Sequence, residues 1–168
     1  MLSIRKEQAE DLSAIRSVNE QAFNQHEEAD IVDRLRSLGD SVMSLVAIRD
    51  NAIVGHILFS PVTIEEDSGV IEGMGLGPMA VLPDFQGQQI GSALVESGLG
   101  ILRGRICPFV VVLGHPQYYP RFGFEPASRH GITCQWEEVP DEAFMVLILD
   151  EGAMKTVSGK ALYREEFG

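Results

Sequence analysis

Residues 79–94 read Met-Ala-Val-Leu-Pro-Asp-Phe-Gln-Gly-Gln-Gln-Ile-Gly-Ser-Ala-Leu, a pattern that predicts a strand, a loop and a helix in succession. It leaves an apolar strand, turns through a polar loop, and continues from Ile90 as an amphipathic helix. A helix N-terminus offers unpaired N–H groups and a partial positive charge. Small residues at Gly87, Gly91 and Ser92 would let a diphosphate approach that backbone. The alternative is a plain strand–turn–helix connection, and spacing alone does not choose between the two.

Other phosphate-binding patterns are missing from the chain. The sequence has no GxxxxGK[ST] motif. Gly73, Gly75 and Gly77 do not form GxGxxG, and they lie inside an expected strand rather than before a helix. A kinase, a P-loop ATPase or a nicotinamide-dependent enzyme is therefore disfavoured.

The segments on either side alternate between strand and helix patterns. Strands are expected at residues 2–5, 42–49, 52–64, 70–81, 109–113 and 143–149, helices at 12–22, 31–38 and 90–102, and a short turn or helix at 117–122. The glycines and Pro78 within 70–81 predict a bulge or a close backbone approach. This order predicts an α/β layer fold with a mixed sheet.

Composition limits the classes of protein. The 168 residues carry a net charge of −12, which disfavours nucleic-acid binding. The segment between Asp84 and Glu137 has two acids and four bases, which would suit a small anionic ligand. The longest apolar run, residues 143–149, is too short to span a membrane. Two distant cysteines and no metal-ligand spacing predict a reduced cytoplasmic protein without a metal.

Several motifs, in order, resemble the GNAT superfamily of acetyl-CoA-dependent N-acetyltransferases. Val81-x-Pro-x-x-Gln-x-x-x-Ile-Gly-x-x-Leu94 is similar to its acetyl-CoA loop, and residues 116–124 are similar to its Tyr-x-x-x-Gly-Phe segment. Residues 54–61, 113–116 and 140–145 resemble the YhbS-like branch. The resemblance implies a GNAT fold: a mixed, mostly antiparallel central sheet, helices on both faces, and two splayed parallel strands, at 70–81 and 109–113.

The resemblance also implies a donor site. Acetyl-CoA would lie between the splayed strands, with its pantetheine arm on the backbone of Met79, Ala80 and Val81. The Met79 N–H would polarise the thioester carbonyl and hold the oxyanion. The diphosphate would bind the loop, for which the cofactor-binding residues are Gln86, Gly87, Gln88, Gln89, Ile90, Gly91 and Ser92. The remaining phosphate would meet arginines among Arg103, Arg105, Arg121 and Arg129.

Tyr119 matches the family's general acid, and it also contacts the cofactor in that family. A phenol stays protonated at neutral pH and can protonate the departing thiolate. Core packing is the alternative role for this ring. The general base is open among Glu72, His56, His115 and a chain of waters.

One residue departs from the family's loop. Gln89 stands where glycine is usual. If its φ angle is positive, the non-glycine residue costs about 1 kcal/mol or more, and if the position is helical it costs nothing.

We expect residues 1–150 to form one N-acetyltransferase domain and residues 151–168 an extension packed on or near it. The expected reaction moves an acetyl or short acyl group from acetyl-CoA to a primary amine on a small molecule or a peptide. A homodimer is an open possibility, and no nucleic-acid or membrane partner is expected. The alternatives are an acyl-CoA sensor or interaction module without turnover, a structural subunit, and transfer to an alcohol or thiol.

Overall fold

The computed structural model describes residues 1–168, and the chain forms two compact units. The first unit contains Met1–Phe59, Gly77–Ile101 and Glu165–Gly168, and the second contains Ser60–Leu76 and Leu102–Arg164. The long strands β3 (Ala52–Glu66) and β4 (Gly69–Val81) each contribute one part of their length to either unit.

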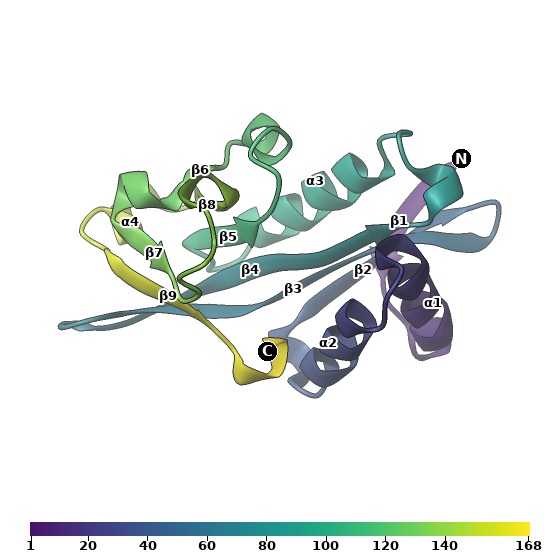
Figure 1. Ribbon diagram of the computed structural model, residues 1–168, viewed down its shortest axis with the longest axis horizontal. Coiled ribbons are helices and arrows are strands. Elements are labelled where there is room, and N and C mark those ends of the chain that lie inside the picture. The colour runs from purple at the N-terminus through teal and green to yellow at the C-terminus, as the bar shows by residue number, and fades with distance from the viewer. The chain divides into compact units, whose positions relative to one another are not determined.

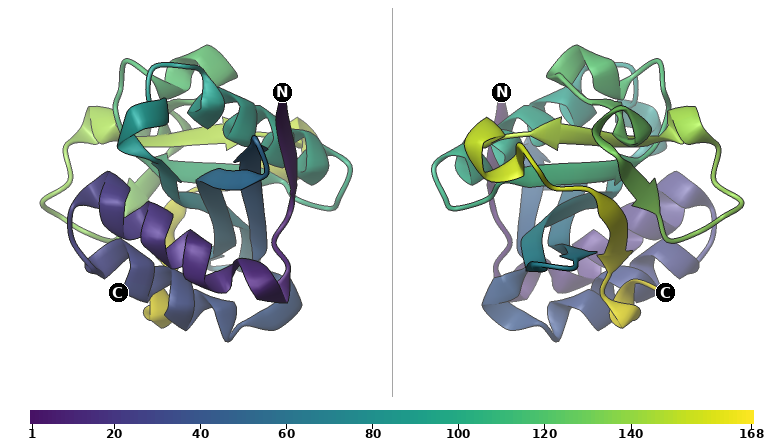
Figure 2. Two further views of the ribbon diagram at one scale, coloured as in Figure 1. Left: turned by 90° about the vertical axis from the view of Figure 1, so that its right-hand side faces the viewer. Right: turned by 90° about the vertical axis from the view of Figure 1, so that its left-hand side faces the viewer.

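The first unit is a sheet covered by helices. Its strands follow the order β1-β2-β3-β4, with β1 (Leu2–Lys6) and β2 (Met43–Arg49) antiparallel, and β2 antiparallel to the first half of β3. Helices α1 (Leu12–Phe23) and α2 (Glu27–Arg36) lie side by side in Figure 1. Figure 2 shows these two helices, in purple and blue, beside the strands of this unit.

Apolar spacing explains where α1 and α2 pack. They share a buried cluster with the two strands beneath them, made of Ile15, Val32, Leu35, Val46 and Leu58. The 3.6-residue period places these helical side chains on one face, and burial of that face is what stabilises each helix.

The helix α3 (Ile90–Arg103) packs on the other face of β3. A Cβ atom at Gly55 would lie 3.1 Å from side-chain atoms of both Ile90 and Leu94. A Cβ atom at Gly98 would lie 2.3 Å from the ring of Phe59. These two glycines therefore let α3 approach the strand closely.

The second unit continues with strands in the order β3-β4-β5-β8-β6. Strand β5 (Phe109–Leu113) is parallel to β4, with Met74 opposite Val110, and antiparallel to β8 (Phe144–Ile148). The short β6 (Glu125–Pro126) pairs with β8. Strand β9 (Gly159–Tyr163) is antiparallel to the second half of β3 and parallel to β7 (Ile132–Cys134).

Two glycines of β4 stand where a side chain would collide with neighbouring atoms. A Cβ atom at Gly73 would lie 2.5 Å from the carbonyl oxygen of Phe109, and one at Gly75 would lie 2.7 Å from the ring of Tyr163. The close backbone approach predicted for this strand is therefore confirmed at Gly73, whereas at Gly75 it is side chains that lie close to the strand.

The mixed α/β fold predicted from the sequence is confirmed, with antiparallel pairs and the parallel pair β4–β5. Helix α2 begins at Glu27, four residues before the predicted apolar pattern. Strands β6, β7 and β9 and the one-turn helix α4 (Glu151–Met154) were not predicted. No helix is both long enough and apolar enough to cross a membrane.

Candidate functional site

The loop between β4 and α3 belongs entirely to the first unit, and its ends are held by hydrogen bonds. The Leu82 N–H donates to the Val54 carbonyl at 2.9 Å, which ties the end of β4 to β3. Residues Pro83–Phe85 form a 3₁₀ turn. The side chain of Gln86 then folds back, with Nε2 donating to the Val81 carbonyl at 3.0 Å. The loop is therefore anchored through its own polar side chain.

The backbone amides between Gln86 and the first turn of α3 come next along the chain. A hydrogen bond at the start of α3 runs from the Ala93 N–H to the Gln89 carbonyl at 3.1 Å. The amides of Ile90 and Gly91 precede this bond and lie in the first turn of the helix. Residues 86–89 are exposed, while Ile90 is buried against the sheet. This arrangement is suited to an anion at the helix N-terminus.

Two residues of the loop have left-handed backbone conformations. Gly87 has φ +77° and Gln89 has φ +66°. For Gly87 this conformation is free of strain, whereas the Cβ atom of Gln89 makes it costly by about 1 kcal/mol. Of the two possibilities left open by the sequence, the structure shows the strained one.

Arg49 is a loop neighbour that the sequence analysis missed. It is the last residue of β2, and its Nη1 donates a hydrogen bond to Oε1 of Gln88. The two residues are 39 positions apart, and the pairing of β2 with β3, together with the bond from Leu82 to Val54, brings them close. The arginines predicted to meet a phosphate include two with other partners within the second unit. Arg121 stacks on Tyr118 with its Cζ 4.5 Å from the ring centre, and Arg129 pairs with Glu125 at 3.7 Å.

The end of β4 presents Met79, Ala80 and Val81 immediately before the loop. Ala80 is buried, while Met79 and Val81 are half-buried, as expected for alternate residues of a strand. These are the residues whose backbone amides were predicted to contact the thioester carbonyl and the pantetheine arm.

Tyr119 lies in the second unit, at the start of the 3₁₀ turn Tyr119–Phe122. Its ring is buried and meets three other aromatic rings, those of Tyr118, Phe122 and Phe124. Burial raises the pKa of the Tyr119 phenol well above its usual range, and the neighbouring Tyr118 adds to this effect. The phenol therefore stays protonated at neutral pH, as a proton donor must.

The structure disfavours His56 as a general base. Its ring is fully buried and both ring nitrogens have hydrogen-bond partners. The Ser44 hydroxyl donates its only proton to Glu7, so it accepts from His56 Nε2–H at 2.8 Å. Asn19 Nδ2 donates to His56 Nδ1 at 3.1 Å. Burial lowers the pKa of His56 to about 4, so this neutral imidazole is part of the core.

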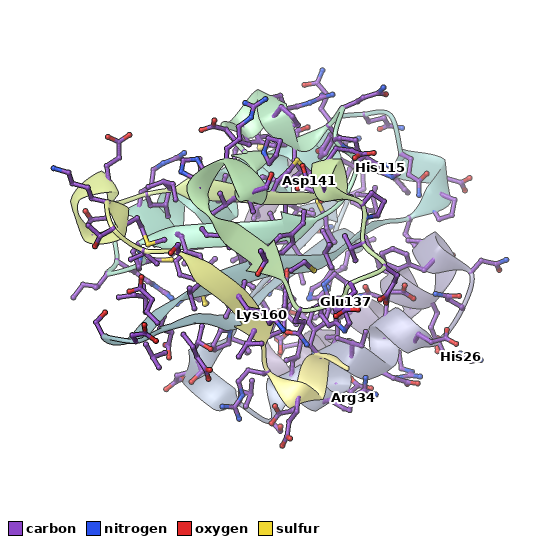
Figure 3. All side chains as sticks on the ribbon, turned by 60° about the vertical axis from the view of Figure 1, so that its left-hand side comes forward. His26, Arg34, His115, Glu137, Asp141 and Lys160 are labelled. Atoms are coloured by element: carbon purple, nitrogen blue, oxygen red, sulfur yellow. The ribbon has the colours of Figure 1, made fainter.

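The two other candidate bases, Glu72 and His115, lie in the second unit, and both are exposed. Glu72 is on β4, before the parallel pairing with β5 begins at Met74. His115, labelled in Figure 3, follows β5, and its carbonyl accepts the N–H groups of Tyr118 at 3.0 Å and Tyr119 at 3.4 Å. No group of three or more His, Cys, Asp or Glu side chains is placed to hold a metal ion.

A family model described as an acetyltransferase (GNAT) domain matches residues 3–127. The chain belongs to this family. It is accordingly an acyltransferase with the GNAT fold. The matched range includes the loop, the end of β4, and Tyr119.

Two proteins of Escherichia coli strain K12 are similar in sequence. The uncharacterized N-acetyltransferase YhbS is 34% identical over 165 residues, which are 98% of this chain and 97% of YhbS. The uncharacterized N-acetyltransferase YjhQ is 42% identical over 122 residues, which are 70% of this chain and 66% of YjhQ.

Two GNAT crystal structures are similar in both sequence and fold. YhbS from Escherichia coli in complex with CoA has a TM-score of 0.91 at 34% identity, covering 99% of this chain and 91% of that one. A GNAT family acetyltransferase from Brucella melitensis in complex with acetyl-CoA has a TM-score of 0.81 at 35% identity, covering 100% and 99%.

Proposed function

We propose that the protein transfers an acetyl or short acyl group from acetyl-CoA to a primary amine, by direct attack of the amine within a ternary complex. The observation that carries this proposal is the exposed turn at residues 86–89, which leads directly into the N-terminus of α3. Family membership and the two relatives that bind CoA and acetyl-CoA support the same donor.

In this proposal the first unit binds the donor. The amides of residues 87–92 hold the diphosphate, because a helix N-terminus stabilises negative charge. The side chain of Gln86 keeps the turn in place through its bond to the Val81 carbonyl. Arg49, held beside Gln88, adds a positive charge to a site that has few others. The backbone of residues 79–81 pairs with the amides of the pantetheine arm.

The proposed chemistry has one covalent exchange. The neutral amine nitrogen attacks the thioester carbonyl carbon, and the Met79 N–H stabilises the resulting oxyanion. The C–S bond then breaks, and the Tyr119 phenol donates its proton to the thiolate sulfur. The proton lost by the amine goes to Glu72, to His115 or to water. The products are the amide and CoA with a free thiol.

The test measures thiol release from acetyl-CoA with a panel of primary amines: free lysine, an alkyl diamine, an aromatic ethylamine and a peptide with a free N-terminus. Isothermal titration calorimetry with CoA measures binding separately. We expect saturable CoA binding, and thiol release that depends on the amine and produces its amide by mass spectrometry.

Saturable CoA binding without release in the presence of any amine would favour an acyl-CoA sensor instead. Thiol release at one rate regardless of the amine would indicate hydrolysis and contradict the transfer reaction. The absence of CoA binding would contradict the donor site itself.

A further inference from the structure

We propose that Gly114 is a positioning residue for Tyr119: because it lacks a side chain, the phenol ring lies directly against the backbone that follows β5. This inference rests on the proposed role of Tyr119 as the proton donor. Gly114 itself does not contact the substrate. It acts only through the position of the Tyr119 ring, for which it leaves space.

Space, rather than backbone conformation, excludes a side chain at position 114. A Cβ atom there would lie 2.3 Å from Cε2, 2.8 Å from Cδ2 and 3.3 Å from Cζ of Tyr119. Carbon atoms in ordinary contact are about 3.5–4.0 Å apart. The φ angle of Gly114 is outside the left-handed region, so its conformation is open to any residue. The ring of Tyr119 is thus what requires glycine here.

The backbone at Gly114 is held in place from the other side. Its N–H donates to the Ala143 carbonyl at 3.0 Å, which attaches it to the residue preceding β8. A methyl group at this position therefore displaces the ring more readily than the backbone.

The ring has little room in which to move. Its centre is 5.0 Å from the ring centre of Tyr118 and 5.7 Å from that of Phe124, both edge-on, and 6.3 Å from that of Phe122. With Gly114, these rings define where the hydroxyl lies at the end of the side chain. A displacement of about 1 Å at a reacting group can lower a rate by about a hundredfold.

The test compares Gly114→Ala with Gly100→Ala. A Cβ atom at Gly100 meets nothing within 4 Å, and this exposed position late in α3 has no part in the proposed chemistry. Phe124→Leu serves as a second variant, because it loosens the packing of another ring against Tyr119. Added to Gly114→Ala it gives the displaced ring room, so the double variant tests the same inference if Gly114→Ala alone does not fold.

The first measurement needs no acceptor. Protein labelled with ¹³C at tyrosine Cζ gives one signal for each of its three tyrosines, and Tyr119→Phe identifies that of Tyr119. We expect Gly114→Ala and Phe124→Leu to shift this signal and to lower the pH at which it titrates, as the ring becomes more exposed. Gly100→Ala should leave it unchanged. An unmoved Tyr119 signal in Gly114→Ala overturns the inference.

The second measurement is kcat with acetyl-CoA and the amine that gives the fastest thiol release in the panel. We expect Gly114→Ala to lower kcat about tenfold to a hundredfold, with the KM for acetyl-CoA changed less than about twofold. In a Tyr119→Phe background the same substitution should lower kcat less than about twofold. Equal losses in both backgrounds would show a merely structural role and overturn the inference. If Tyr119→Phe leaves kcat unchanged while the signal still shifts, the proposed acid fails and the packing relation stands.

Discussion

The buried imidazole of His56 shows how a single side chain is assigned by its surroundings. Asn19 and Ser44 bind its two nitrogens, and Glu7 in turn accepts from Ser44 and from Arg36 at 2.8 Å. These residues come from α1, β2, the end of β1 and α2, so the network joins the helices to the sheet of the first unit. A neutral histidine in such a network stabilises the fold only while it remains neutral.

This network makes stability depend on pH. The pKa of His56 is lowered to about 4 in the folded protein, against about 6.5 when unfolded. Between these values the unfolded chain binds a proton that the folded protein does not, so stability is lost as the pH falls. Between pH 7.5 and pH 5 we expect this residue to account for a loss of about 2 kcal/mol in the free energy of unfolding, measured by urea denaturation.

The control is His56→Gln, which keeps polar atoms in the core but does not titrate. It should be less stable than the native protein at pH 7.5 and should lose less stability on acidification. Equal losses in both proteins would contradict a buried neutral His56.

Tyr119 is the residue on which the proposed turnover depends. Tyr119→Phe keeps the ring in its aromatic surroundings but removes the proton donor. We expect kcat to fall about a hundredfold or more, with CoA affinity by calorimetry nearly unchanged. Tyr118→Phe, which keeps the neighbouring ring, should retain most activity. A parallel fall in CoA affinity would instead indicate that the Tyr119 hydroxyl acts mainly in binding.

At the scale of elements, the turn from β4 into α3 combines strain with anchoring. The left-handed Gln89 is costly, while Gln86 and the Leu82 amide hold both sides of the turn. Strain that persists at a candidate site is held by the surrounding contacts.

We therefore expect Gln89→Gly to raise the free energy of unfolding by about 0.5–1 kcal/mol, since glycine adopts φ +66° without strain and loses part of this gain to its more flexible unfolded chain. Gln88→Gly is the matched control. Gln88 is not left-handed, so its substitution should lower stability. A decrease for Gln89→Gly in thermal or urea unfolding would contradict the strain.

The turn before α3 also leads to a prediction about the positive charge of Arg49. Arg49→Gln removes the guanidinium beside Gln88, and we expect the Kd for CoA to rise about two- to fivefold at low salt. The effect should shrink in 0.5 M salt, because screening weakens exposed charge pairs. Lys155→Gln, which removes an exposed positive charge of the second unit, is the control. An equal effect from Lys155→Gln in calorimetry would show that net charge alone sets the affinity and would contradict a local role of Arg49.

At the scale of the whole molecule, local sequence patterns predicted most of the strands and helices. Each of the long strands and the three longer helices was predicted, because burial of one face leaves a period of two or 3.6 in the apolar residues. Strands β6 and β7 were missed because they have only two and three residues, and β6 contains a proline. Strand β9 has five residues, but its first three, Gly159, Lys160 and Ala161, are of types depleted in strands. Such strands form because neighbouring strands pair with them, and their own residues show no clear strand pattern.

Sequence patterns alone predicted the order of the long strands and helices, the turn before α3, a close backbone approach within β4, and the resemblance to the family. These properties are local, or are written in residues close together along the chain. Tertiary structure alone decided that His56 is sealed in a network with Glu7, that Arg49 lies at Gln88, and that Tyr119 occupies the space of a missing side chain at Gly114. Each of these depends on side chains brought together by strand pairing, helix packing or turns, and no pattern of spacing encodes the distance between them.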